Sequence, residues 1–302
     1  MDMHSPRELA LLYRQGKNIT QLMRDERGLI HNSNEIIEIS YDLQAGSYIE
    51  SMGEAWMAEH NAEYCQQLAK VILSLCNPDS ILEAGIGEAT TLADLLPHLS
   101  KKISSYGFDI SWSRVAYGKQ WLQQQGISNT VLCTGNLCHI PFADNAVELV
   151  YTSHSLEPNG GNEAAILKEL YRVTSKFLVL LEPGYELANK DAKHRMEQHG
   201  YCRNIKSIAQ SLGYRILLHE FFPSSVNPLN PTVITIIEKP PSFEPAKHIL
   251  ACPKYKTPLE NIENMLFSPE SLMVYPIVGG IPCLGINNGL VASKFRELIS
   301  KG

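Results

Sequence analysis

The chain of 302 residues is long enough for one large domain or for two unequal domains with a sizeable core. Its composition, with 44% hydrophobic and 19% charged residues, is typical of a soluble globular protein, and a formal net charge of -6 argues against non-specific binding to nucleic acid. No apolar run approaches the roughly 20 residues that a membrane-spanning helix needs, and the first residues carry no signal-peptide pattern.

The cysteines indicate a reducing environment. There are 7 of them, an odd number at scattered positions, which fits reduced thiols better than a disulfide framework. Cys133 and Cys138 are not supported by a second close pair, so we expect no bound metal. These observations favour a cytoplasmic location.

Residues 1–76 are predicted to form a helical extension. Apolar residues at helical spacing predict helix from residue 1 to about 30 and again from about 60 to 76. Between them, residues 39–48 contain two tyrosines, Tyr41 and Tyr48, without a clear period, which predicts irregular chain. The extension either packs on the main domain or covers a binding site.

The sequence ILEAGIGEATT carries the pattern of a buried strand, a tight turn and a helix. Gly85 and Gly87 let the backbone turn sharply and let a ligand approach without a Cβ in the way, and the following helix offers free N–H groups. A dinucleotide fingerprint would need a third glycine, where this chain has Ala89 and Thr90. Glu83 would repel a pyrophosphate but can hold the ammonium of an amino-acid moiety. These features disfavour a NAD-dependent oxidoreductase, and the turn could also serve the fold alone.

From residue 79 to 238, strand and helix patterns alternate. Such alternation predicts an α/β fold with a doubly wound, mostly parallel, seven-stranded sheet. The last two strands are joined by a loop without a helix, so they should form an antiparallel hairpin. Strands are predicted at 80–84, 105–109, 130–134, 147–152, 177–182, 214–222 and 232–238. Helices are predicted at about 88–97, 112–125, 162–173, 185–198 and 204–212.

The pattern of an acid, any residue, Gly, any residue and Gly resembles the first motif of the class I S-adenosylmethionine-dependent methyltransferases, of the methyltransferase type 11 kind. A sheet that ends in an antiparallel hairpin is also the arrangement of that family, so the resemblance covers residues 77–240. It implies a transferase that binds S-adenosyl-L-methionine on a Rossmann-like fold, with Glu83, Gly85 and Gly87 at the cofactor.

The same resemblance implies a role for the extension. In that family the segment before the first motif often covers the cofactor and the acceptor. Tyr41 and Tyr48 could then line the substrate site, because an aromatic face can lie against a sulfonium.

Ligands of such a sheet lie beyond the carboxyl ends of its strands. Asp109 follows the second strand, about 20 residues after the glycines, where an acid can accept both ribose hydroxyls. Its alternative role as a helix N-cap could be filled by Ser111. After the third strand, the resemblance places Asn136 and Leu137 at the adenine, with Asn136 where the family commonly has Asp, so that the adenine contact could pass to the backbone or to the amide oxygen.

The fourth strand ends at Ser153 and His154. In the family this strand end faces the methionine part of the cofactor and the acceptor, which assigns Ser153 to the cofactor. His154 is the candidate catalytic base because a near-neutral pKa suits the removal of a hydroxyl proton, and Glu157 could orient it. A lone histidine can equally be a structural hydrogen-bonding residue.

Three further side chains could border the acceptor. Glu182 ends the fifth strand, where an acceptor-binding and a structural role are both open. His199 and Tyr201 flank a predicted helix C-cap at Gly200, and solvated surface is the competing interpretation. His194 and His199 are five positions apart, so they do not share a helix face as a zinc-binding pair would.

Residues 239–245 are Pro-rich and are predicted to form a stiff linker, and residues 246–302 to form a small α+β domain. The segments ILACPKYKTPL and MVYPIVGGIPCL resemble the small zinc-ribbon-like proteins that activate tRNA and translation-factor methyltransferases. Only Cys252 remains of the usual thiolates, with Tyr255 and Ser268 at two other positions, and one thiol cannot form a tetrahedral zinc site. We therefore predict a metal-free domain that caps the catalytic domain or binds a protein partner.

The sequence leaves the acceptor open. An acidic chain without a basic run favours a small molecule, with O-methylation if His154 is a base. The C-terminal resemblance favours RNA or protein instead. A catalytically silent scaffold that binds a partner is the alternative outside enzymology.

Overall fold

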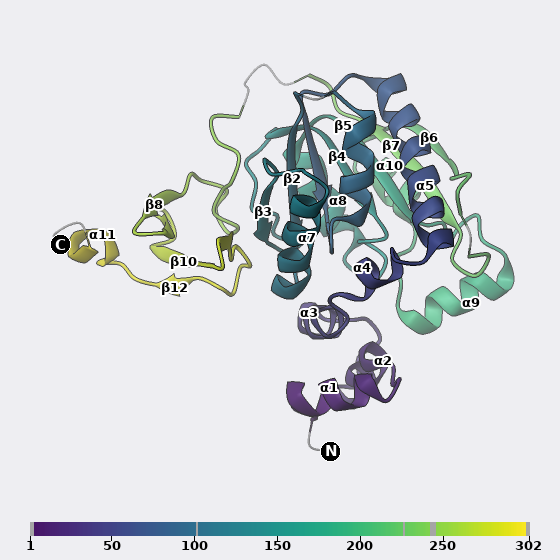
Figure 1. Ribbon diagram of the computed structural model, residues 1–302, viewed down its shortest axis with the longest axis horizontal. Coiled ribbons are helices and arrows are strands. Elements are labelled where there is room, and N and C mark those ends of the chain that lie inside the picture. The colour runs from purple at the N-terminus through teal and green to yellow at the C-terminus, as the bar shows by residue number, and fades with distance from the viewer. Residues whose placement is uncertain (1–2, 101, 226, 242–245, 300–302) are drawn as a thin grey trace.

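A seven-stranded sheet forms the body of the molecule in the computed structural model, which describes residues 3–100, 102–225, 227–241 and 246–299 (Figure 1). Its strands are β1 (Ser80–Ala84), β2 (Ser104–Asp109), β3 (Val131–Thr134), β4 (Val147–Ser153), β5 (Thr174–Pro183), β6 (Arg215–Phe221) and β7 (Thr232–Glu238). They lie in the order β3-β2-β1-β4-β5-β7-β6. The strands from β3 to β5 are parallel, and β7 pairs antiparallel with both β5 and β6. The predicted sheet and its terminal hairpin are confirmed.

The helices around the sheet are α5 (Ala55–Leu75), α6 (Thr90–Leu95), the 3₁₀ helix η1 (Leu96–His98), α7 (Trp112–Gln124), α8 (Glu163–Val173), α9 (Lys190–His199) and α10 (Ile205–Ser211). Successive strand residues point to opposite faces, and each face has its own buried cluster. Leu82 and Leu178 belong to the cluster that includes α8 and α10, whereas Ile81 and Val179 belong to the one that includes α5, α6 and α7. No helix in the described part of the chain is long and apolar enough to cross a membrane.

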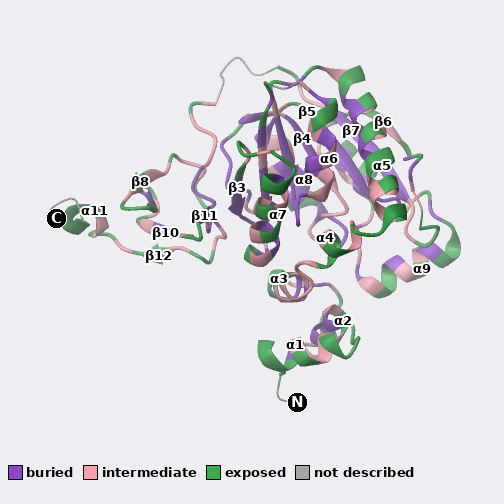
Figure 2. Cartoon of the chain, in the orientation of Figure 1, coloured by how far each residue is buried: buried purple, intermediate pink, exposed green. Residues whose placement is uncertain are grey.

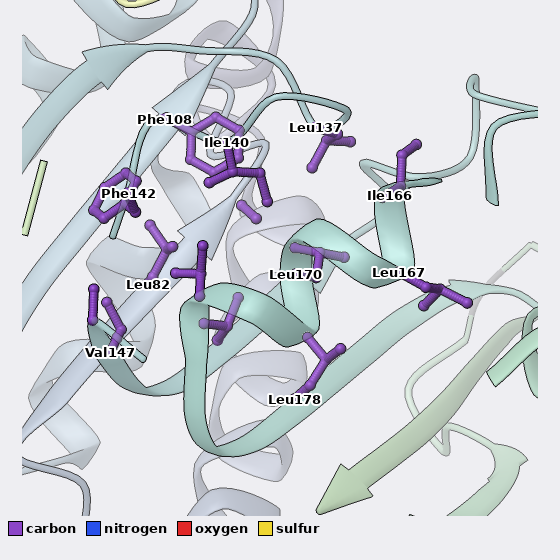
Figure 3. Packing of buried hydrophobic residues seen from close by; sticks show 14 of the residues in the cluster. Leu82, Phe108, Leu137, Ile140, Phe142, Val147, Ile166, Leu167, Leu170 and Leu178 are labelled. Carbon is purple, nitrogen blue, oxygen red and sulfur yellow. The ribbon is translucent and has the colours of Figure 1, made fainter. Parts of the chain in front are cut away.

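The core includes the contact between α8 and the central strands. Figure 3 shows Leu167, Leu170 and Leu178 in one buried cluster, and Figure 2 shows the central strands buried. These three side chains are fully buried, and burial of each contributes about 1.5–3 kcal/mol. This packing fixes the strands whose carboxyl ends carry the candidate site residues.

The N-terminal extension is helical over most of its described length, as α1 (Pro6–Arg14), α2 (Ile19–Glu26), α3 (Asn34–Leu43) and α4 (Ser47–Ser51). The prediction of irregular chain at 39–48 was wrong. Ser33 caps α3 by accepting a hydrogen bond from the backbone N–H of Ile36, and α3 buries Ile36, Ile37 and Ser40 on one face.

Two other predicted helices begin elsewhere. The predicted helix at 60–76 begins at Ala55. The predicted helix at 185–198 begins at Lys190, because the side chain of Asn189 accepts a hydrogen bond from the backbone N–H of Ala192 at 2.9 Å and caps it there. At α9 the cap residue therefore sets the boundary more sharply than the apolar period does.

The C-terminal segment forms a small antiparallel sheet with a short helix. Its elements are β8 (Glu260–Ile262), β9 (Met265–Ser268), β10 (Met273–Val278), β11 (Ile281–Pro282), β12 (Leu290–Val291) and α11 (Phe295–Ile299). Of the predicted linker at 239–245, residues 242–245 lie outside the described residues. In the described ranges, no three His, Cys, Asp or Glu side chains are grouped as metal ligands.

The C-terminal segment covers the edge strand β3. Cys283 pairs in parallel with Thr134, and the N–H of Leu284 donates to the carbonyl of Thr134 at 3.2 Å. Nearby, the N–H of Ala251 donates to the carbonyl of Pro141 at 3.0 Å. An uncovered edge would leave backbone groups free to pair with another chain, so this segment protects the sheet.

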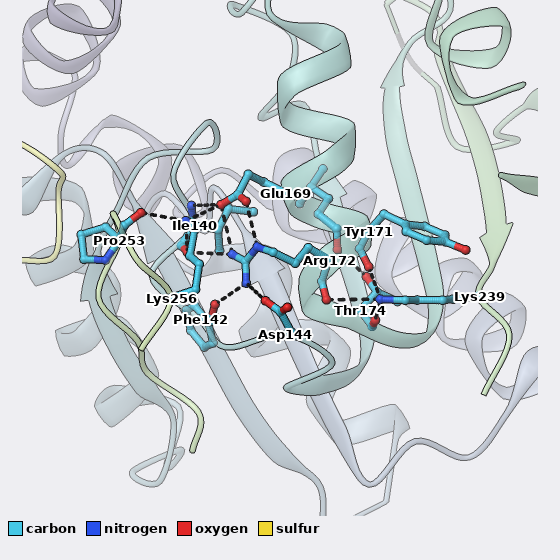
Figure 4. A network of polar contacts seen from close by, with 11 residues as sticks. Ile140, Phe142, Asp144, Glu169, Tyr171, Arg172, Thr174, Lys239, Pro253 and Lys256 are labelled. Atoms are coloured by element: carbon cyan, nitrogen blue, oxygen red, sulfur yellow. Dashed lines mark hydrogen bonds and ion pairs between the residues drawn. The ribbon is translucent and has the colours of Figure 1, made fainter. Parts of the chain in front are cut away.

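Charged side chains reinforce this junction (Figure 4). Lys256 Nζ lies 2.6 Å from Glu169 Oε2 on α8, and Arg172 lies 2.8 Å from Glu169 Oε1. Arg172 also donates to the carbonyls of Ile140 and Phe142. The Glu169 and Lys256 side chains are largely buried, so losing one partner would leave an uncompensated charge.

Leu284 tests how far the C-terminal segment stabilises the whole chain. It is fully buried in the same cluster as Leu82 and Leu178. Leu284→Ala should lower the free energy of unfolding by about 2–5 kcal/mol, measured by urea denaturation. Leu290→Ala, at a residue that is 69% exposed, is the matched control and should change it little. Equal stabilities of the two variants would contradict the claim that the C-terminal segment stabilises the chain through Leu284.

Candidate functional site

A cavity of about 610 Å³ opens at the carboxyl ends of β1, β2 and β4. This volume is typical of sites for small ligands. Most of the predicted site residues line it: Tyr41, Tyr48, Glu83, Gly85, Gly87, Asp109, Asn136, Leu137, Ser153, His154 and Glu157. Glu182, His199 and Tyr201 are not among its lining residues.

The glycine turn leaves no room for side chains. Gly85 has φ +77°, and a Cβ there would lie 2.2 Å from Ser155 Cβ. Ser155 Oγ donates to the carbonyl of Ala84 at 2.6 Å, which holds the two turns together. Gly87 has φ +53°, and its N–H donates to Asp109 Oδ2 at 2.9 Å. Both glycines are therefore required by the fold at the floor of the cavity.

Asp109 is buried at the end of β2. Its two carboxylate oxygens each accept one backbone N–H, from Gly87 and from Ser111, both at 2.9 Å. Ser111 Oγ accepts from the backbone N–H of Arg114 and caps α7, so Asp109 is not needed as the cap. A carboxylate has about four lone-pair sites, which leaves acceptor capacity for a ligand.

Glu83 lies below the turn and is 2% exposed. The hydroxyl of Tyr151 donates to Glu83 Oε2 at 2.9 Å. Burial is the main cause that raises the pKa of Glu83, to about 8. Without a ligand, this group is therefore mostly protonated at pH 7, and a cation would favour its ionised form.

Asn136 and Leu137 form a turn after β3. Asn136 Oδ1 accepts from the backbone N–H of Cys138 at 2.7 Å, which occupies part of the acceptor capacity expected for adenine. The carbonyl of Asn136 accepts from the N–H of His139 at 3.0 Å, which leaves the amide nitrogen for a ligand. Leu137 is buried against the core beside Ile140 and Phe142.

His154 has an unusual backbone, with φ 56°. Its Nδ1 lies 2.8 Å from Glu157 Oε2, and its Nε2 lies 2.9 Å from Thr232 Oγ1. Burial alone lowers the pKa of His154, but the hydrogen bond and charge of Glu157 raise it overall. Asn230 Nδ2 donates to the same Glu157 oxygen at 3.0 Å. The imidazole is thus held between a carboxylate and a hydroxyl.

Glu182 supports this arrangement from behind. Its carboxylate accepts the backbone N–H groups of Ser155, Leu156 and Glu157, each at 3.1 Å. It is 2% exposed, and burial raises its pKa to about 7. The position of Glu182 fits the structural role that the sequence left open.

Tyr201 and His199 lie outside the lining. Tyr201 is hydrogen-bonded to Glu157, and burial is the main cause that raises the pKa of its hydroxyl. The ring of His199 lies 5.2 Å from that of Tyr201. Tyr201 therefore does not line the cavity itself but is hydrogen-bonded to Glu157, which does.

The N-terminal helices dock onto the glycine turn. Asp42 of α3 accepts the hydroxyls of Ser111 and Ser113 at 2.7 and 3.1 Å. Glu88, directly after the glycines, accepts two backbone N–H groups at the start of α4, at 3.0 and 2.8 Å. Tyr41 of α3 and Tyr48 of α4 therefore line the cavity.

Sequence reasoning missed several lining residues, namely Glu88, Arg114, Ser224, Asn230 and Thr232. Glu88 is adjacent to the glycine motif, but its partners are about 40 residues away along the chain. The other four carry no local motif, and only the fold brings them to the cavity.

Residues 81–176 match the family of methyltransferase domains. The chain contains a methyltransferase domain. The Cβ-free turn and the buried Asp109, with its remaining acceptor capacity, fit S-adenosyl-L-methionine as the methyl donor of such a domain. The match does not include the C-terminal segment. No curated protein matches the sequence.

Solved structures are similar in fold. Magnesium protoporphyrin IX methyltransferase from Synechocystis, with bound SAH, shares 13% identity at a TM-score of 0.52, covering 69% of this chain and 100% of that one. A candidate O-methyltransferase from Nostoc punctiforme shares 12% sequence identity at a TM-score of 0.51, and the match covers 66% of this chain and 60% of that one. One chain in a complex of the methyltransferase activator Trm112 with a candidate methyltransferase from Haloferax volcanii shares 15% sequence identity at a TM-score of 0.51. The match covers 66% of this chain and 97% of that one. At these identities the similarity shows the fold alone.

Glu83 should make the stability of the methyltransferase depend on pH. Its raised pKa means that the folded state binds more protons than the unfolded state between about pH 4.5 and 8, so stability falls as pH rises through that window. Glu83→Gln removes this titration. In urea denaturation without ligand, the variant should gain roughly 2–5 kcal/mol relative to wild type between pH 5 and 8.

Glu59→Gln, at an exposed position of α5, is the matched control and should keep the wild-type slope. If the Glu83→Gln slope were also parallel to the wild-type slope, the protonated state of buried Glu83 would be refuted.

Proposed function

We propose that this methyltransferase modifies a hydroxyl group of a small molecule, with His154 as the general base. The observation that carries the proposal is the 2.9 Å contact between His154 Nε2 and the Thr232 hydroxyl at the cavity wall. It supports a site in which an acceptor hydroxyl takes the place of Thr232. The carboxylate of Glu157 favours the tautomer with a proton on Nδ1, so Nε2 carries the lone pair.

The surroundings of His154 support this chemistry. Glu157 would stabilise the imidazolium that forms when the proton is taken, and Asn230 and Tyr201 hold Glu157 in place. Bound S-adenosylmethionine supplies an already activated methyl group. The protein then needs to orient the acceptor hydroxyl, remove its proton and exclude water.

The cofactor assignments follow the geometry of the cavity floor. We assign the ribose to Asp109, the ammonium to Glu83, and the close backbone approach to Gly85 and Gly87. Asn136, Leu137 and Ser153 complete the proposed cofactor site, with the adenine at the first two. All of them line the cavity.

The acceptor end favours a neutral polar molecule. Within the described residues, Ser224 Oγ and Asn230 Oδ1 are buried without a hydrogen-bond partner, and a ligand hydroxyl could donate to either. The carboxylate of Glu157 at this end disfavours an anionic acceptor such as RNA. The folds of the Synechocystis and Nostoc proteins, one a porphyrin methyltransferase and one a candidate O-methyltransferase, agree with a small acceptor.

We divide the chain into a lid at 1–76, a catalytic domain at 77–240 and a cap at 246–302. The pairing of the C-terminal segment with β3 supports its role as a cap. The Haloferax complex contains an activator protein, and a protein partner on the outer face of the cap is the second candidate role. Free cysteines, most of them buried, support a cytoplasmic location.

His154→Gln tests the catalytic proposal. It should lower kcat by about 10²–10⁴-fold, the usual contribution of a general base, while calorimetric binding of S-adenosylhomocysteine stays within about threefold of wild type. His219→Gln is the matched control, because His219 also contacts a threonine hydroxyl at 2.9 Å but does not line the cavity. Equal losses of turnover and binding would refute a base role.

The acceptor class is tested by release of S-adenosylhomocysteine from S-adenosylmethionine with four sets of acceptors. These are neutral hydroxyl compounds, amines, carboxylates and tRNA. Turnover with hydroxyl compounds is expected. Turnover confined to tRNA or to amines would overturn the proposal, and cofactor binding without any turnover would favour a scaffold.

A further inference from the structure

Arg114 is a buried cation at the cavity wall, and one of its N–H donors has no hydrogen-bond acceptor. It lies on α7, is 7% exposed and lines the cavity with Asp109. Within the described residues, its Nε is buried without a hydrogen-bond partner. Glu88 Oε1 lies 3.8 Å from Nε, which is beyond hydrogen-bond distance.

Two aromatic rings lie close to this guanidinium. Its central carbon lies 4.8 Å from the ring centroid of Tyr48 and 5.2 Å from that of Tyr41. Both rings belong to the lid. On another side, Nη2 lies only 2.8 Å from where a Cβ of Gly87 would be. Aromatic contacts stabilise a guanidinium, but they supply no oxygen acceptor for its N–H donors.

Glu88 and Asp109 offset part of the charge, but a buried N–H donor without an acceptor is costly, so this position calls for an explanation. Burial alone lowers the pKa of Arg114, and the charge of Asp109 is the largest opposing cause, so that the pKa is raised overall. The side chain therefore stays charged. A ligand with oxygen acceptors beside Asp109 and Gly87 would satisfy its donors, and a guanidinium suits paired oxygen acceptors.

We propose that Arg114 is a cofactor-binding residue that donates to oxygen atoms of S-adenosylmethionine and links the bound cofactor to the lid through Tyr41 and Tyr48. The inference rests on the proposed placement of the cofactor in this cavity. Two groups of the cofactor carry suitable oxygens, the ribose hydroxyls and the methionine carboxylate. Asp109 accepts from ribose hydroxyls in the proposed site, so Arg114 could donate to the same oxygens.

The experiment is calorimetric titration of the full chain with S-adenosylhomocysteine, which requires no acceptor and no turnover. Arg114→Met should weaken binding about 10–100-fold, which corresponds to the loss of a charged hydrogen bond. Arg114→Lys keeps the charge without the planar fork and should show a smaller loss. Tyr48→Leu, which removes a lid contact, should also weaken binding.

The matched control is Arg215→Met, at a mostly exposed arginine on β6 that pairs with Glu238 and does not line the cavity. It should bind as wild type does. Thermal unfolding of each ligand-free variant checks its fold, and if Arg114→Met does not fold, Arg114→Lys carries the test.

Two analogues identify the group that Arg114 contacts, one lacking the carboxylate and one with 2′-deoxyribose. The analogue without the contacted group should bind the wild-type protein more weakly than S-adenosylhomocysteine does. The Arg114→Met variant should bind that analogue with the same affinity as the wild-type protein does. The inference is overturned if the substitution lowers the affinity for both analogues as much as it lowers the affinity for S-adenosylhomocysteine. It is also overturned if the variant and the wild-type protein bind S-adenosylhomocysteine equally. If wild type does not bind S-adenosylhomocysteine, the proposed cofactor site itself fails, and the inference fails with it.

Discussion

The close approach of two turns, one after β1 and one after β4, is the constraint on which the site depends. Gly85 and Ser155 lie so near that a Cβ on residue 85 would be 2.2 Å from Ser155 Cβ. The N–H groups of Gly85 and Ile86 both donate to the carbonyl of Phe108 at 2.9 Å, so the end of β2 joins the same point. Only glycine allows this approach. It brings the ends of β1, β2 and β4 to one cavity.

Buried acids connect this geometry to the proposed chemistry. Glu182 accepts three successive backbone N–H groups and thereby fixes the turn that carries His154 and Glu157. Its raised pKa, like that of Glu83, reflects burial. Because the pKa values of both carboxyl groups lie near 7 to 8, the folded protein loses stability as the pH rises. The tightly packed sheet beneath the site offsets that loss.

Much of the catalytic fold could be predicted from the sequence, because strands and helices of a doubly wound sheet have clear apolar periods and Gly85, Gly87 and Asp109 have local reasons to be where they are. The helix at 34–43 was missed because its start depends on a cap at Ser33 more than on its apolar period. Arg114 gave no signal either. On a helix, its spacing does not distinguish a solvent-exposed residue from one buried between two rings.

The sequence by itself determined the order of the strands along the chain, the turn that admits a cofactor and the acid at the end of β2, since each follows from local conformational preference or periodicity. Only the tertiary structure decided the partners of each polar group. Glu88 accepts from the N–H of Gly46, His154 contacts Thr232, and Leu284 donates to Thr134 at the end of β3, and each pair is far apart in sequence. Such contacts depend on how separate elements pack, and no local pattern of residues records that packing.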